Sequence, residues 1–171
     1  IGGKGDLMMP ITIRPAGTAD LDAVAAIEEA CFPAAEAATR ESLKERLAAF
    51  RHSFLIAEKE GIPVGFINGC VTAQRILTDD LYESTVHHDD AAANMMVFGL
   101  DVIPKKQHHG IAAQLMQTYI ALAKERHKAL ITLTCKKRLI SFYEQFGYVC
   151  EGKSTSIHGG AVWYNMTMYL K

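Results

Sequence analysis

The spacing of apolar residues along this chain switches repeatedly between every second residue and every third or fourth, which predicts alternating strands and helices. The elements predicted in the first half are a strand at residues 9–14, helices at 18–31 and 39–50, and strands at 53–58 and 62–71. Phe32-Pro33 ends the first helix, because proline cannot continue a helical backbone. Lys59-Glu60-Gly61 is typical of a hairpin turn between the two later strands.

The second half opens with residues 72–94, a polar and acidic segment without clear period that has room for one short helix. Long irregular segments of compact domains are usually functional or mobile. The elements predicted after it are strands at 95–102, 130–135, 148 onward and 162–170, and helices at 110–126 and 139–146. The resulting order, β-α-α-β-β-β-α-β-α-β-β, predicts an α/β domain with mixed strand pairing.

The length of 171 residues fits one domain, predicted at residues 9–171, with residues 1–8 as a cloning remnant or flexible lead-in. Eighteen basic and nineteen acidic side chains leave a net charge of −1, which argues against nucleic acid or an anionic membrane as a partner. No apolar stretch approaches the roughly 20 residues of a membrane span. The four cysteines form no C-x-x-C pair, which favours reduced thiols and a cytoplasmic location.

The junction between the strand at 95–102 and the helix at 110–126 has the composition of an anion-binding site. The start of a helix presents backbone N–H groups without intrahelical partners and the positive end of the helix dipole. Gly110, Ala112 and Ala113 would let a phosphate approach closely. We therefore predict a diphosphate site; the alternative is an ordinary helix start that happens to use glycine.

Two motifs resemble a known family. Gln107-x-x-Gly110-x-Ala112 resembles the Q/R-x-x-G-x-G/A signature of the GNAT superfamily of N-acetyltransferases, which bind acetyl-CoA. Ser141-Phe142-Tyr143-Glu144-Gln145-Phe146-Gly147-Tyr148 resembles the family's second motif, F-Y-x-x-x-G-F/Y on a short helix. Ile13-Arg14-Pro15-Ala16 and Glu28-Glu29-Ala30-Cys31-Phe32-Pro33 also fit. The resemblance is closest to the arylalkylamine (serotonin-type) branch.

The resemblance implies a GNAT-like α/β fold, a mixed, splayed central β-sheet flanked by helices, with acetyl-CoA as co-substrate. The strand backbone at Leu100, Asp101 and Val102 would pair with the pantetheine arm. The diphosphate would lie on the residues that follow, which are Gln107, His108, His109, Gly110, Ile111, Ala112 and Ala113. One free N–H within residues 98–100 would polarise the thioester carbonyl and stabilise the oxyanion.

The implied reaction is direct attack of a primary amine, small or peptide-like, on the acetyl group, through a tetrahedral intermediate. Tyr143 stands at the family's acid position and would protonate the leaving thiolate, unless it is an ordinary half-buried aromatic residue. Met96 and Phe98 stand where serotonin-type enzymes carry two histidines, so the group that removes the amine's proton is not assigned.

The candidates for that group are Glu28, Glu29 and the run His87-His88-Asp89-Asp90, whose other interpretations are a polar helix face and a solvated loop. The side chain of Asp101 is assigned no role. A metal site is not expected, because adjacent ligands rarely converge on one ion and no H-x-x-x-H spacing occurs.

Other features leave alternatives open. Lys136-Lys137-Arg138 could meet the ribose phosphate of the coenzyme or be solvated, and Phe32-Pro33 could contact the acceptor or serve the core. The missing histidine pair motivates a second hypothesis, a non-catalytic acyl-CoA-binding or regulatory domain. Exposed C-terminal strands would permit a homodimer.

Overall fold

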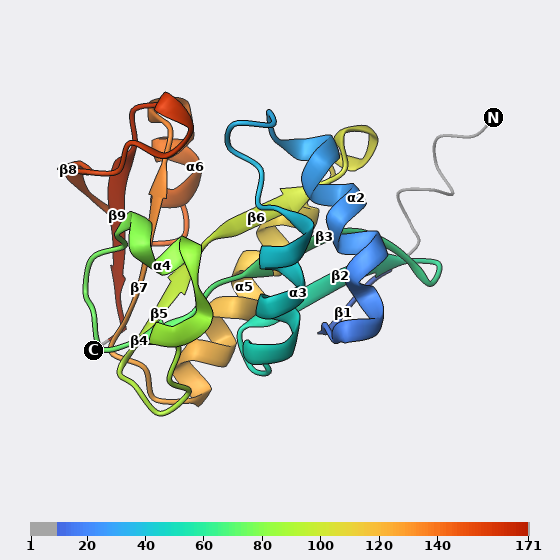
Figure 1. Ribbon diagram of the computed structural model, residues 1–171, viewed down its shortest axis with the longest axis horizontal. Coiled ribbons are helices and arrows are strands. Elements are labelled where there is room, and N and C mark those ends of the chain that lie inside the picture. Colours follow the sequence, from blue (N-terminus) through green and yellow to red (C-terminus); the bar gives the residue numbers. More distant parts are fainter. Residues whose placement is uncertain (1–9, 171) are drawn as a thin grey trace.

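The computed structural model describes residues 10–170, whose strands form two sheets that diverge from one another (Figure 1). The four-stranded sheet is antiparallel, in the order β1 (Ile11–Pro15), β2 (Phe54–Lys59), β3 (Ile62–Asn68) and β6 (Gly99–Val102). The five-stranded sheet has the order β4 (Val71–Thr72), β5 (Asn94–Val97), β7 (Leu130–Cys135), β9 (Tyr164–Tyr169) and β8 (Val149–Lys153). Its β5 and β7 are parallel. The prediction for residues 1–8 lies outside the described residues.

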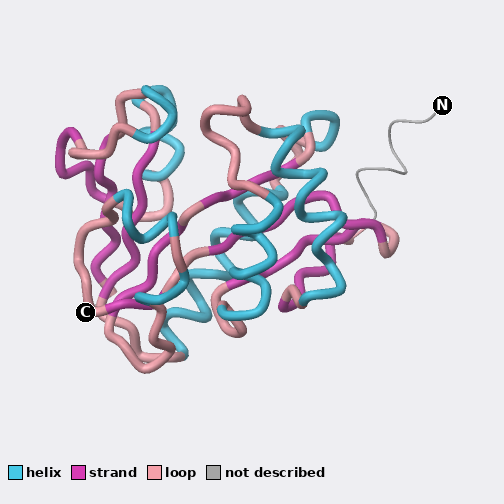
Figure 2. The backbone as a smooth tube through the Cα atoms, viewed as in Figure 1, coloured by secondary structure: helices cyan, strands magenta, loops and turns pink. Residues whose placement is uncertain are grey.

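Helices flank the sheets, as Figure 2 shows in cyan. The α-helices are α2 (Leu21–Cys31), α3 (Arg40–Ala49), α4 (Asp79–Glu83), α5 (Ile111–Glu125) and α6 (Ile140–Glu144). Short 3₁₀ helices are η1 (Thr18–Asp20), η2 (Thr85–His87), η3 (Pro104–Lys106), η4 (Lys137–Leu139) and η5 (His158–Gly160). The predicted mixed, splayed α/β architecture is confirmed, with the refinement that the splay is complete enough to give two sheets.

Two hydrophobic clusters fill the spaces between the layers. The cluster on the α5 side contains Leu55, Ile67 and Val102, and the cluster on the side of α2 and α3 contains Phe54 and Phe66. Side chains alternate along a strand, so the neighbours of Val102 in β6 point to the opposite face. Asp101 therefore points toward α2, among apolar side chains.

The predicted strand at 95–102 is wrong as one continuous element, because it divides at Phe98 into β5 and β6. The backbone N–H of Met96 donates to Cys70 O at 2.8 Å, and that of Phe98 donates to Asn68 O at 2.7 Å. We call this crossing of residues 68–70 with residues 96–99 the seam. The seam joins the two sheets and sets the point at which they part.

Gly69 is the tightest point of the seam. A Cβ added there would stand 1.7 Å from the carbonyl oxygen of Met96, a backbone atom that cannot rotate aside. We predict that Gly69→Ala lowers the free energy of unfolding by about 2–3 kcal/mol, the usual range for overpacking. Urea denaturation measures the loss. The matched control is Gly17→Ala, because a Cβ at Gly17 would meet nothing within 4 Å; it should stay within about 0.5 kcal/mol of the parent protein. Equal stability of the two variants would contradict the prediction.

Candidate active site

The gap between the diverging sheets exposes backbone groups of β6. Ile103 N–H donates to Val64 O at 2.9 Å, and hydrogen-bonded residues alternate along an antiparallel pair. The N–H groups of Leu100 and Val102 therefore face away from β3, into the gap. β6 is the edge strand of its sheet. Of the predicted region 98–100, the N–H of Phe98 is already bonded to Asn68, so Leu100 carries the available donor.

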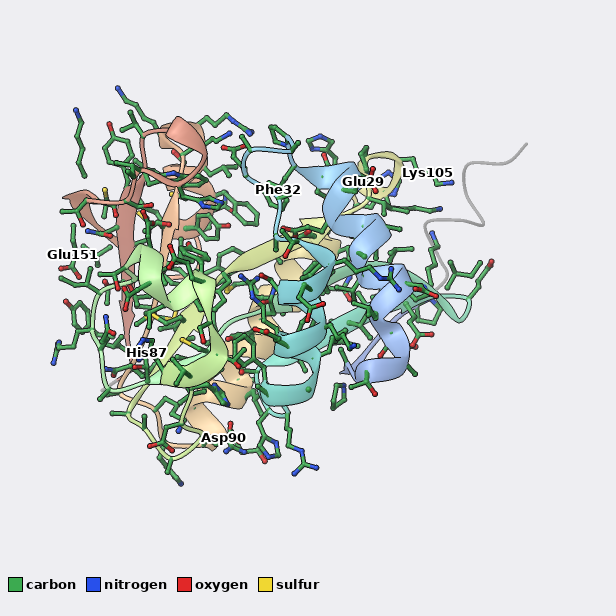
Figure 3. The ribbon with its side chains drawn as sticks, viewed as in Figure 1. Glu29, Phe32, His87, Asp90, Lys105 and Glu151 are labelled. Atoms are coloured by element: carbon green, nitrogen blue, oxygen red, sulfur yellow. The ribbon has the colours of Figure 1, made fainter. Side chains whose placement is uncertain are left out.

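A cavity of about 560 Å³ opens beside this gap. Its floor and one side come from the seam and from the end of β7, with Phe98, Gly99, Leu100, Thr134 and Cys135. The segment at residues 32–39 that follows α2 also lines it, and Figure 3 shows Phe32 on that segment. The cavity thus connects the gap between the two sheets with the surface beside the irregular segment at residues 32–39.

An aromatic wall encloses the cavity. Tyr82 in α4 packs against Phe98 with ring centroids 4.8 Å apart and stacks on His158 at 5.4 Å. Trp163 donates from Nε1 to His158 O at 2.9 Å, and His158 Nε2 lies 2.8 Å from Glu36 O. Three segments far apart in the sequence are therefore held together around one opening.

Tyr143 in α6 lines the same cavity and is 8% exposed. Its ring contacts Phe142 and Tyr148 edge-on, while no hydrogen bond of its hydroxyl to another described residue is present. Burial raises the pKa of Tyr143 above its ordinary value, with Cys135 and Asp101 as smaller causes. The phenol is therefore protonated at neutral pH and is available as a proton donor.

Two carboxyl groups meet under the seam. Glu28 in α2 and Asp101 in β6 are 6% and 1% exposed, and their carboxyl groups lie against each other. Glu28 Oε2 also accepts from Ala38 N–H at 2.7 Å. Burial, followed by the contact with Glu28, raises the pKa of Asp101 well above its ordinary value. Glu28 lines the cavity, and Asp101 lies behind it.

Arg46 in α3 is the buried cation of this region. Its guanidinium lies 4.8 Å from the ring centroid of Phe98 and donates to Asn68 Oδ1 at 3.4 Å and to Tyr82 O at 3.3 Å. It attracts the charge of Glu28 without forming a direct ion pair with Glu28 or Asp101 in the described residues. This part of the interior thus holds two carboxyl groups and one guanidinium.

The loop before α5 forms a concave row of backbone donors, which we call the cradle (residues 107–113). His108 and Gly110 adopt left-handed backbone conformations, with φ of 64° and 83°. Such turns aim successive N–H groups to one side and create an anion-binding nest. Gln114 N–H donates to Gly110 O, whereas within the described chain the N–H groups at 108–113 have no protein acceptor. The Gln107 side chain donates to Val102 O at 2.9 Å and ties the cradle to β6.

Several sequence candidates fall elsewhere. His88 is buried, accepts from Val71 N–H at Nδ1 and contacts Asp90 through Nε2, so it supports the loop. His87 and Asp90 lie away from Phe32 in Figure 3 and do not line the cavity. Glu29 is exposed. The run His87-His88-Asp89-Asp90 therefore does not fold over the cavity; its place is taken by Tyr82.

The remaining alternatives are also placed by the structure. Lys136 forms an ion pair with Glu36 at 2.7 Å and lies 5.8 Å from the ring centroid of Trp163, so it belongs to the wall of the cavity. Phe32 and Pro33 line the cavity, as the acceptor interpretation predicted. No group of three or more metal-ligating side chains occurs among the described residues, and no helix within residues 10–170 could cross a membrane.

Sequence reasoning missed several lining residues, which are Glu36, Arg46, Tyr82, His158 and Trp163. It also assigned no role to the Asp101 side chain, although one signal was present. Asp101 alternates with Leu100 and Val102 in a strand buried on both faces. An acid at such a position must point into an interior, where it needs a partner.

Comparison with protein families matches residues 21–148 to the acetyltransferase (GNAT) family, and the chain belongs to that family. Comparison with the curated proteins gives no match. Among solved structures, the GphF GNAT-like decarboxylase in complex with isobutyryl-CoA has a TM-score of 0.82 at 20% identity, over 94% of this chain and 100% of that one.

Two further solved structures are acetyltransferases. Arabidopsis thaliana Naa50, in complex with a bisubstrate analogue of CoA, has a TM-score of 0.74 at 14% identity, over 94% of this chain and 99% of that one. The PaiA N-acetyltransferase from Thermoplasma acidophilum, in complex with coenzyme A, has a TM-score of 0.69 at 16% identity, over 94% and 99%. These relatives share the fold and are diverse GNAT proteins, so the arylalkylamine branch stays a prediction.

The buried acid pair predicts a pH-dependent stability. Unfolded Asp ionises near pH 3.9, whereas folded Asp101 keeps its proton to higher pH, so the folded state binds more protons in that interval and loses stability as pH rises. Asp101→Asn removes this dependence. We predict that the variant is more stable than the parent at pH 8, on the order of 1 kcal/mol, with a smaller difference near pH 4. Thermal unfolding at both pH values measures this; a gain that grows toward low pH would contradict it.

Proposed function

We propose that this protein transfers an acetyl group from acetyl-CoA to a primary amine. The observation that carries the proposal is the continuity of three features: the cradle, the unpaired N–H of Leu100, and a cavity that holds the hydroxyl of Tyr143. Together they provide for a diphosphate, a thioester carbonyl and a leaving thiolate in the order in which these groups occur along acetyl-CoA.

The cradle fits the diphosphate of the coenzyme. The N–H groups of residues 108–113 lack protein acceptors, and a Cβ on Gly110 would meet nothing within 4 Å, so an anion can come close to this backbone. The open edge of β6, where the N–H groups of Leu100 and Val102 face the gap, supports pairing with the pantetheine amides. The backbone of Asp101, which was also predicted to pair with the coenzyme, faces Phe66 of β3 instead. The predicted residues His109, Ile111, Ala112 and Ala113 would bind through their backbone, because three of these four side chains cannot form hydrogen bonds.

The thioester carbonyl would lie against the N–H of Leu100. A fixed donor in a site shielded from water stabilises the oxyanion that forms when the amine attacks. As the carbonyl re-forms, the bond from carbon to sulfur breaks and the thiolate takes the proton of Tyr143. Acetyl-CoA supplies the activated acyl group, and the chain supplies orientation, the oxyanion donor and the acid.

The acceptor would occupy the cavity between Phe32, Tyr82 and Trp163. Flat apolar walls favour an amine with an apolar or aromatic body, which agrees with the resemblance to the arylalkylamine branch. A screen of acetyl-CoA consumption across arylalkylamines, polyamines, amino acids and peptides tests the function. Coenzyme binding without transfer to any amine would favour the non-catalytic acyl-CoA-binding domain instead, and absence of binding would contradict both. Cytoplasmic location and a homodimer stay predictions.

Removal of the Tyr143 hydroxyl tests the acid. We predict that Tyr143→Phe lowers kcat by about 100-fold or more at pH 7, because general acid catalysis contributes that much, and leaves the Kd of CoA unchanged. Steady-state kinetics and calorimetry give the two values. Tyr169→Phe is the control, since Tyr169 is 51% exposed in β9, and it should keep full activity. An unchanged kcat in the first variant would remove Tyr143 from the mechanism.

A negative charge in the cradle should weaken the binding of CoA without lowering the stability of the protein. We predict that Ala113→Glu, in the first turn of α5, weakens CoA binding about tenfold or more, because like charges a few ångströms apart repel by about 1–4 kcal/mol. The same charge at a helix N-terminus stabilises the helix by about 0.3–1 kcal/mol, so the melting temperature should not fall. Calorimetry and thermal unfolding measure both, with the exposed Ala121→Glu as control. Unimpaired CoA binding by Ala113→Glu would place the diphosphate elsewhere.

A further inference from the structure

The seam holds a carboxyl group whose burial the fold alone does not explain. Both carboxyl oxygens of Asp101 are sealed from solvent, and no N–H or cation of the described residues bonds to them. A buried carboxylate without donors is costly, so the group must keep a proton. Among the described residues, the acceptor available to that proton is Glu28, whose carboxyl group lies against that of Asp101. We therefore take Asp101 as the donor of this pair and Glu28 as the acceptor.

Glu28 is held in position for contact with the cavity. One of its oxygens, Oε2, accepts from Ala38 N–H at 2.7 Å. The other, Oε1, stands 3.9 Å from the point where a Cβ of Gly99 would lie, and Asp101 Oδ1 stands 3.0 Å from the same point. The absence of a side chain at Gly99, next to Leu100, thus leaves the carboxyl pair beside the proposed position of the thioester.

From these contacts we propose that Glu28 binds the ammonium group of the acceptor and takes the proton that its nitrogen must lose, and that Asp101 is a positioning residue behind it. The inference rests on the proposed function and fills the role that the absent histidine pair leaves open. A primary amine with a pKa near 10.4 is almost fully protonated at pH 7, so attack requires such a group.

The charges around the pair support this division of roles. Arg46 in α3 attracts the negative charge of Glu28. Cys31 in α2 donates to Val102 O at 3.2 Å, and burial raises the pKa of its thiol to about 12, so it is neutral. Tyr143 in α6 is neutral as well. Other charged side chains also line the cavity, which are Glu36, Asp79, Glu83, Lys136 and Arg138. Of these, Glu36 is paired with Lys136, and Asp79 accepts hydrogen bonds from Ser156 and Ile157.

The proton balance closes with the groups already named. The nitrogen lone pair forms the bond to the thioester carbon while the carbonyl π electrons move to oxygen, and the N–H proton moves to Glu28. When the bond from carbon to sulfur breaks, sulfur takes a proton from Tyr143. The proton on Glu28 then returns to the Tyr143 phenolate through solvent, which restores both groups for the next turnover. Transfer from a neutral amine releases no net proton; starting from the ammonium form, one further proton passes to water.

Glu36 is the rival for this role, since it is also buried at the cavity. Its carboxylate is already engaged by Lys136 Nζ at 2.7 Å, whereas Glu28 forms no ion pair with a cation of the described residues and is the carboxyl group available to an ammonium. The two assignments predict different variants to be impaired. Glu29, the exposed neighbour of Glu28, is the matched control.

The test compares two acceptors that differ mainly in basicity, 2-phenylethylamine and its β,β-difluoro analogue, whose fluorines lower the basicity of nitrogen. Glu28→Gln should lower kcat/KM by about 100-fold or more for the first amine, the size of a lost general base, and by about tenfold or less for the second. Glu29→Gln should keep the parent kcat/KM for both amines. Any loss of kcat/KM in Glu36→Gln should be the same for the two amines, because Glu36 lines the cavity without taking the proton. A general distortion of the cavity would impair both amines alike.

Asp101 is tested by rescue. Asn keeps a donor toward Glu28, so Asp101→Asn should stay within about threefold of the parent in kcat/KM, below the tenfold loss that one fully lost hydrogen bond gives. Asp101→Leu removes the donor, so it should lose activity and shift the acid limb of the kcat/KM profile to higher pH, because Glu28 becomes more basic. Circular dichroism of each variant checks folding.

The inference is overturned if Glu28→Gln lowers kcat/KM equally for both amines, or if Glu36→Gln shows the selective loss for the more basic amine. It is also overturned if the kcat/KM of Asp101→Asn is no higher than that of Asp101→Leu. If the parent protein transfers acetyl to no amine, the proposed function fails by itself. Calorimetric binding of 2-phenylethylamine to the CoA complex then decides: binding that Glu28→Gln abolishes keeps Glu28 as the ammonium-binding group, and equal or absent binding removes it.

Discussion

The close backbone contact at the seam is the constraint on which the rest of the structure depends. Where residues 68–70 cross residues 96–99, the N–H groups of Met96 and Phe98 bond to the opposite chain and Gly69 leaves no room for a side chain. Because β5 pairs with β7 while β6 pairs with β3, the two sheets must part just after this point. The open edge of β6 and the cavity are both consequences of that parting.

Much of the fold follows from apolar spacing. The strand β2, the helix α5 and the strand β7 lie within a residue or two of their predicted bounds, and β3 begins where predicted but ends three residues earlier, at Asn68. The division of residues 95–102 could not be predicted. It depends on which partner each half pairs with, and Val97 and Gly99 carry no local mark of that choice.

The candidate site likewise has one part that local sequence patterns predict and another that they do not. The cradle is a local structure, so glycine spacing and helix position predicted it. The acceptor side is assembled from α2, α3, α4 and the segment before β9, and no local pattern brings Tyr82 to His158 or Glu28 to Asp101. The run at residues 87–90 was a candidate for the group that removes the amine's proton, yet His88 accepts a hydrogen bond from Val71 N–H and holds a loop in place. Polar residues that cluster in sequence are thus poorer guides than a lone acid in a buried strand.

The wall of the cavity has an evolutionary consequence. Asp79 accepts from Ser156 Oγ and, at 3.2 Å, from Ile157 N–H, and these contacts join the segment before β5 to the one before β9 without involving the seam. Changes in either segment can therefore reshape the entrance of the cavity while the cradle and the open edge of β6 keep their geometry. A chain built in this way can alter what its cavity admits through drift in its connecting loops, without any change in the backbone at the parting of the sheets.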